Sequence, residues 1–104
     1  MGNRKQPFGY MIEVGTIVIN PLEALVVNKI YAEYARGISY SQLTQMLREQ
    51  PIQYDVDKRW NKNMVARILQ DSRYLGNTNF PEIIHPEIAK LVSDRLEKRS
   101  KTSD

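Results

Sequence analysis

Apolar residues return every three to four positions along four segments of the chain, which is the spacing of helices that bury one face. The pattern predicts helices over residues 21–36, 40–49, 62–71 and 86–99. Asn20, Ser39 and Asn61 precede the first three of them, and side chains of this kind cap free backbone N–H groups. Gly37 and Pro51 are residues that end helices, so the first two boundaries are sharply defined.

The apolar faces of these helices identify the expected core. It comprises Leu22, Val26, Val27, Ile30, Tyr31 and Tyr34 in the first helix, Tyr40, Leu43, Thr44, Met46 and Leu47 in the second, Trp60, Met64, Val65, Ile68 and Leu69 around the third, and Ile88, Leu91, Val92 and Leu96 in the fourth. Burial of these faces against one another would give a bundle with its polar faces outward.

Residues 10–19 instead alternate weakly and are rich in β-branched side chains, and Gly15 can adopt the positive φ of a tight turn. They predict a small β-hairpin. Residues 51–60 are expected to form a loop, residues 74–77 a turn and residues 78–84 a short extended segment.

The expected fold is mainly α: a helix-turn-helix-like three-helix core with a small N-terminal β-hairpin and a C-terminal helix. A chain of 104 residues allows one domain. Residues 7–99 would form it, with residues 1–6 as a basic arm and residues 100–104 as a disordered tail.

Composition excludes several classes of site. Cysteine is absent and His85 is the one histidine, which excludes disulfides, thiol catalysis, cysteine-ligated zinc and sites built from several imidazoles. No apolar run approaches the ~18 residues that a membrane span needs, and the N-terminus lacks the apolar part of a signal peptide. We therefore expect a cytoplasmic protein with no cofactor, no metal, no catalytic residues, no small-molecule substrate and no membrane partner.

The positive charge of the chain is concentrated in one stretch. Residues 58–73 hold five basic residues against one acidic residue, or +4, whereas residues 1–57 carry −1 and residues 74–104 are neutral. Such a cluster favours a polyanionic partner.

The predicted outer face of helix 62–71 consists of cations, amides and one small residue: Lys62, Asn63, Ala66, Arg67 and Gln70. An α-helix fits the major groove of duplex DNA, where Lys and Arg pair with guanine and Asn and Gln with adenine. These five residues are therefore the candidate base contacts. The candidate contacts to the DNA backbone are Arg4, Lys5, Ser41, Gln42, Gln45, Lys58, Arg59 and Arg73.

Blander interpretations stay open. The polar face of helix 62–71 could simply be solvated, and two basic residues at a terminus could serve solubility alone. The chain could also be a helical protein-interaction module or a small helix-turn-helix regulator. A nuclease would need Asp55 and Asp57 to hold a metal ion, and His85 could be a cap or a base. The ten-residue loop 51–60 between the second and third helices is also longer than the turn of about three or four residues that is usual in a helix-turn-helix motif.

Five segments, in order, resemble the central recombinase domain of large serine recombinases, the phage integrases and transposon resolvases. They are PFGY at 7–10, INPLEALVVNKIYAEYARGIS at 19–39, YSQLTQMLREQPI at 40–52, RWNKNMVARILQDSRYLG at 59–76 and PEIIHPEIAKLVSDRLEKR at 81–99. Departures are Asp71 in place of the usual Asn, Met46-Leu47-Arg48 in place of Leu-Asn, and a short stretch between Gly76 and Pro81.

The resemblance implies recognition of part of a recombination half-site in double-stranded DNA. It implies no strand cleavage, since the family's catalytic serine domain and its zinc ribbon are not in this sequence. The remaining domains of a parent recombinase would be further partners. The chain is expected to be a fragment of that longer protein and not itself an enzyme. The alternative is a natural stand-alone protein.

Overall fold

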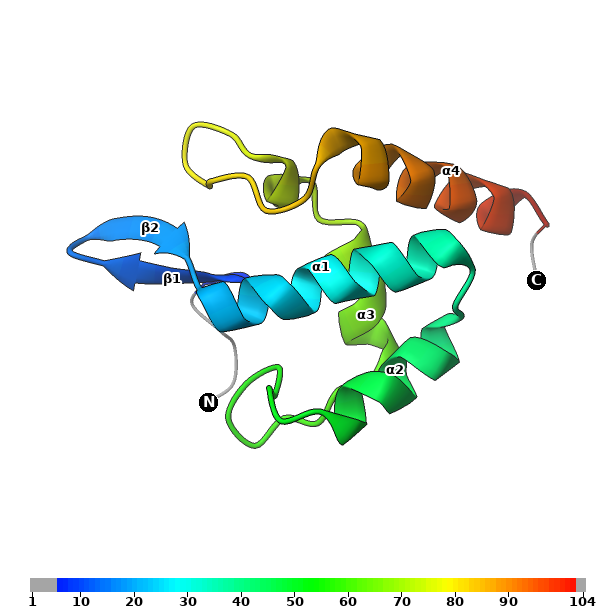
Figure 1. Ribbon diagram of the computed structural model, residues 1–104, viewed down its shortest axis with the longest axis horizontal. Helices are drawn as coiled ribbons and strands as arrows, with labels where there is room; N and C mark the ends of the chain where they lie inside the picture. Colours follow the sequence, from blue (N-terminus) through cyan, green and yellow to red (C-terminus); the bar gives the residue numbers. More distant parts are fainter. Residues whose placement is uncertain (1–5, 103–104) are drawn as a thin grey trace.

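A computed structural model describes residues 6–102 (Figure 1). The elements are β1 (Tyr10–Glu13), β2 (Thr16–Ile19), α1 (Pro21–Arg36), α2 (Tyr40–Glu49), α3 (Lys62–Leu69), a 3-10 helix η1 (Ser72–Leu75) and α4 (Pro86–Thr102). α1 runs through the middle of the fold, with α4 on one side and α2 and α3 on the other (Figure 1). The mainly helical class, the hairpin and the C-terminal helix are confirmed.

The hairpin forms because two consecutive residues turn the chain. β1 and β2 pair antiparallel from Tyr10–Ile19 to Glu13–Thr16, and Val14 and Gly15 between them have φ of 51° and 76°. The Gly9 N–H donates to the Glu23 carboxylate at 2.8 Å, so the hairpin is fastened to the first turn of α1.

The cap signals place α1 and α2 at their predicted bounds. The Asn20 side chain accepts a hydrogen bond from the backbone N–H of Glu23. Ser39 and Gln42 form a reciprocal capping box at the start of α2. Gly37 ends α1 with φ of 115°, a value that suits glycine.

Two predictions about the second half of the chain are wrong. α3 ends at Leu69 rather than at residue 71, because the Asp71 carboxylate accepts from the backbone N–H of Arg73 and starts η1 instead. Residues 78–84 are not extended throughout, since the chain bends at residues 78–80, where the Asn77 side chain accepts from the N–H groups of Asn79 and Phe80 and closes a turn.

The C-terminal helix is longer than predicted. α4 continues to Thr102, so residues 100–102 are helical rather than part of a disordered tail. Lys98 and Arg99 in its last turns are favourable next to the negative end of the helix dipole. Residues 103–104, and residues 1–5 of the predicted arm with Arg4 and Lys5, lie outside the described residues.

The core follows the predicted faces with two exceptions. Leu22 and Leu91 are 61% and 54% exposed, so the described residues leave both side chains largely uncovered. Buried aromatic side chains hold the segment before α1 against the rest: the Tyr74 hydroxyl donates to the Phe8 carbonyl at 2.6 Å, and Phe8 meets Trp60 edge to face.

Alkaline pH should destabilise this fold through its buried tyrosines. Burial and the nearby Asp71 carboxylate raise the pKa of Tyr10 to about 12, and its hydroxyl donates to the carbonyls of Arg73 and Pro81. Because the unfolded pKa is 10.0, this stabilisation is complete below pH 10 and is lost between about pH 10 and 12.

Tyr10→Phe removes that one ionisation. The free energy of unfolding should therefore fall with pH less steeply in the variant, by about 1.4 kcal/mol per pH unit in this window. Urea denaturation at pH 9, 10.5 and 11.5 measures both slopes. Equal slopes for the two proteins would contradict the assignment, whatever the stability of the variant at pH 7.

Candidate nucleic-acid interface

The outer face of α3 is exposed, and its charged and amide side chains make no polar contact with the other described residues. Within residues 6–102, the side chains of Lys62, Asn63 and Arg67 are exposed and have no hydrogen-bond or ion-pair partner. Ala66 between them is half-buried and small, so the helix backbone could approach a ligand closely. This face, formed by Lys62, Asn63, Ala66 and Arg67, is called the α3 ridge below.

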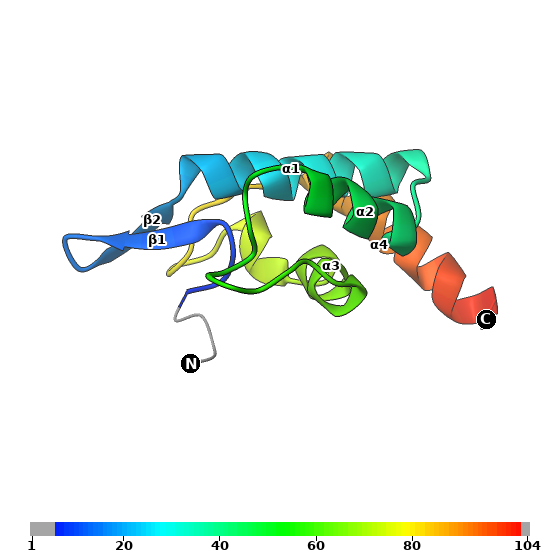
Figure 2. The same cartoon turned by 90° about the horizontal axis from the view of Figure 1, so that it is seen from below.

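Burial of the opposite face fixes the direction of the α3 ridge. Met64, Val65, Ile68 and Leu69 are buried, and α3 packs mainly against α2 and also against α1. α3 lies below α1 and α2 at the edge of the molecule (Figure 2). The α3 helix itself contains no acidic residue, so the ridge carries uncompensated positive charge.

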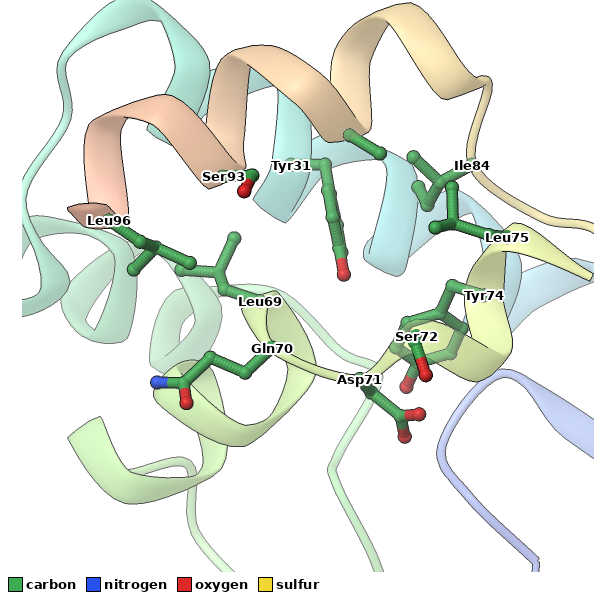
Figure 3. A pocket seen from close by; sticks show the side chains of 11 residues that line it. Tyr31, Leu69, Gln70, Asp71, Ser72, Tyr74, Leu75, Ile84, Ser93 and Leu96 are labelled. Atoms are coloured by element: carbon green, nitrogen blue, oxygen red, sulfur yellow. The ribbon is translucent and has the colours of Figure 1, made fainter.

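Gln70 was predicted as the last residue of the same face, and it lies just beyond the helix. Its backbone N–H closes α3 by donating to the Arg67 carbonyl, while the Asp71 N–H donates to the Ile68 carbonyl, and the Gln70 side chain is exposed. A pocket of about 300 Å³ lies between this end of α3, η1 and α4. Figure 3 shows Gln70 and Asp71 at its rim, with Leu69, Tyr31 and Ile84 around its interior.

Of the predicted backbone-contacting cations, Arg73 is engaged within the protein. It forms a two-pronged ion pair with Asp71, Nε to Oδ1 at 2.9 Å and Nη2 to Oδ2 at 2.8 Å. It also lies over the ring of Phe80. A phosphate would have to compete with Asp71 for this guanidinium.

Lys58 and Arg59 lie in the connection between α2 and α3. Asp55 and Lys58 form an isolated β-bridge, with the Lys58 N–H donating to the Asp55 carbonyl at 3.1 Å. Arg59 is exposed and has no side-chain partner among residues 6–102. Both cations therefore precede the α3 ridge directly in the chain, as the charge pattern predicts.

The predicted neutral contacts on α2 are also exposed. Gln42 spends its carbonyl oxygen on the capping box with Ser39, and the Gln45 amide donates to Glu49. No structural partner holds the Ser41 side chain among the described residues.

The geometry gives little support to a metal site at Asp55 and Asp57 or to a catalytic role for His85. Asp55 accepts from the backbone N–H of Val56, and residues 6–102 hold no group of three or more metal-ligating side chains. The Nδ1 atom of His85 accepts from the Glu87 N–H at 3.1 Å, which is the cap role. In the same part of the chain, no helix is long and apolar enough to cross a membrane.

Two arginines with structural roles were missed. Arg95 on α4 donates to the carbonyls of Tyr34, Gly37 and Ile38 at the end of α1 and lies over the Tyr34 ring. Arg48 on α2 donates from Nε to the Trp60 carbonyl at 2.8 Å. Hydropathy places both on solvent-facing sides, so no local signal could have found these contacts.

Comparison with known proteins gives two findings. The chain matches the model of a protein family described as Recombinase over residues 21–101. Its fold is similar to that in the crystal structure of an LSR–DNA complex, LSR denoting a large serine recombinase, with a TM-score of 0.76 and 20% sequence identity. That match covers 97% of this chain and 35% of the other, so the chain spans about a third of that protein's length. No curated protein matches.

Proposed function

The chain belongs to the Recombinase family, and from this premise we propose that it is a non-catalytic DNA-binding domain that recognises part of a recombination half-site. The α3 ridge enters the major groove of the duplex, where Asn63 and Arg67 read base edges and Lys62 and Gln70 assist. One observation carries the proposal: the ridge is exposed, and its polar side chains have no partner within the described residues.

Positioning falls to groups around the ridge. Lys58 and Arg59 contact phosphates of the strand beside the start of α3, and the exposed polar side chains of α2 add neutral contacts. The other domains of a parent serine recombinase supply the catalytic serine and share the affinity for the full site. Double-stranded DNA is the partner of this domain.

Binding of the isolated domain to a random-sequence duplex should be strongly salt-dependent. Neutralising about four to six phosphates predicts a slope of log K against log salt of roughly −4 to −5. Fluorescence anisotropy between 25 and 200 mM salt measures it. Arg59→Ala should weaken binding to every duplex alike and reduce the slope by about 0.9.

The outcome separates this function from a protein-interaction module. Absence of duplex binding at 25 mM salt would contradict the proposal. A change in base preference caused by Arg59→Ala would contradict the phosphate role assigned to that residue.

A further inference from the structure

Arg48 holds its guanidinium at the start of α3 in a fixed position. Its Nε donates to the carbonyl of Trp60, two residues before Lys62. A guanidinium has five N–H donors, and neither of its terminal nitrogens has a partner among residues 6–102. The side chain is thus tethered by one donor and presents the other four, although the residue is exposed.

A groove of about 480 Å³ lies beside this guanidinium, between the end of α2 and the connection to α3. We call it the Arg48 groove. Its lining includes three cations, Arg48, Lys58 and Arg59, and one carboxylate, Asp57. The buried Trp60 also lines it. The charge of the lining is therefore +2, and an anion is the ligand that it favours.

We propose that the Arg48 groove binds one phosphate of the DNA backbone, with the terminal nitrogens of Arg48 and the guanidinium of Arg59 as its ligands. The proposal rests on the function proposed above: when α3 lies in the major groove, a sugar-phosphate strand borders each end of the helix, and the Arg48 groove lies at its start. Arginine matches a phosphate with two parallel N–H···O bonds.

The tether to Trp60 holds the Arg48 guanidinium beside the groove before any DNA binds. A side chain already held in its bound position loses less conformational freedom when the phosphate arrives. The same bond links the phosphate to the backbone at the start of α3, so the contact would fix how deeply the α3 ridge enters the duplex.

Arg48→Gln tests the proposal on the purified domain. Affinity should fall roughly tenfold on specific and random duplexes alike, and the salt slope should shrink by about 0.9. Arg36→Gln is the matched control, since it removes the same charge from the last residue of α1, where Arg36 forms an exposed ion pair with Glu33. It should leave affinity and slope within twofold of the wild type.

A second variant guards against a simple folding defect. Arg48→Lys keeps the charge, but one ammonium group cannot both hold the Trp60 carbonyl and grip a phosphate as a fork. It should retain the wild-type salt slope and bind a few-fold more weakly. Circular dichroism confirms that each variant is folded at the temperature of the assay.

Neutral methylphosphonates, placed one at a time along the duplex, locate the contact. One position should weaken wild-type binding and have no effect on Arg48→Gln. If the wild type binds duplex DNA and Arg48→Gln binds it with the same affinity and salt slope, the phosphate site in the Arg48 groove is contradicted while the proposed function stands. A wild-type domain that binds no duplex would contradict the proposed function, and this inference with it.

Discussion

Replacing both Asn63 and Arg67 by alanine should reduce the preference of the domain for its own site over random duplex by about 2–6 kcal/mol. Each good two-pronged contact to a base contributes about 1–3 kcal/mol of discrimination. Both side chains are exposed and lack partners within residues 6–102, and alanine is the best helix former. The fold should therefore survive the change while the base contacts disappear.

The measurement needs the preferred sequence first. Selection from a randomised duplex library gives it for the wild type, and competition against random duplex then gives the specificity ratio of each protein. Arg36→Ala with Asn79→Ala removes the same two residue types from exposed positions outside α3 and should preserve the ratio. Equal losses on specific and random duplex would show that the α3 ridge contacts phosphates rather than bases.

The part of the fold that the sequence predicts correctly is the part whose signals are local. α1 and α2 match their predicted bounds because the signals act within a few residues. The side chains of Asn20 and Ser39 accept hydrogen bonds from backbone N–H groups of the first turns, and Gly37 adopts the left-handed conformation that ends α1. Local signals also compete. At the end of α3 the Asp71 side chain starts a new turn, and hydrophobic periodicity alone extended the helix across it.

The extended segment predicted at 78–84 failed for a different reason. The backbone there is arranged by the Asn77 side chain and by the carbonyl of Tyr74, which accepts from the N–H groups of Ile83 and Ile84. Leu22 and Leu91 show a related limit, because helical periodicity gives the direction of a face but not how wide an area the neighbouring elements cover.

The same distinction applies to the interface. The direction of the α3 ridge could be predicted because burial of Met64, Val65 and Ile68 leaves the other side of a short helix facing outward. The contacts of Arg48 and Arg95 could not be predicted, since each side chain donates to a backbone carbonyl in a different segment of the chain. The sequence alone therefore does not show which long polar side chains are free to bind a ligand and which form hydrogen bonds within the protein, because this depends on the packing.

Trp60 links the core to the proposed interface, and Trp60→Ala should lower the free energy of unfolding by about 3–5 kcal/mol. Its ring is 2% exposed and meets the rings of Phe8 and Tyr54 edge to face, with centroids 5.1 and 5.5 Å apart. Its Nε1 donates to the Ile52 carbonyl at 2.9 Å. The substitution leaves a cavity and removes that donor.

For a domain of this size the loss corresponds to a decrease in Tm of roughly 15–30 °C, which thermal denaturation followed by circular dichroism measures. Trp60→Phe serves as the control, since it keeps an aromatic ring in the cluster and loses the hydrogen bond to Ile52. It should be destabilised by about 1–2 kcal/mol. A Tm for Trp60→Ala within a few degrees of the wild type would contradict the central place given to this ring.

The two Trp60 variants should also differ in their base preference when they bind DNA. Trp60 stands immediately before the cap of α3, and its carbonyl holds Arg48. At a temperature where both variants are folded, Trp60→Phe should therefore retain the base preference of the wild type, because the backbone at the start of α3 is unchanged. Trp60→Ala should lose part of that preference through displacement of this backbone. Unaltered preference in Trp60→Ala would mean that the packing of α3 against α1 and α2 positions the α3 ridge without help from the Trp60 ring.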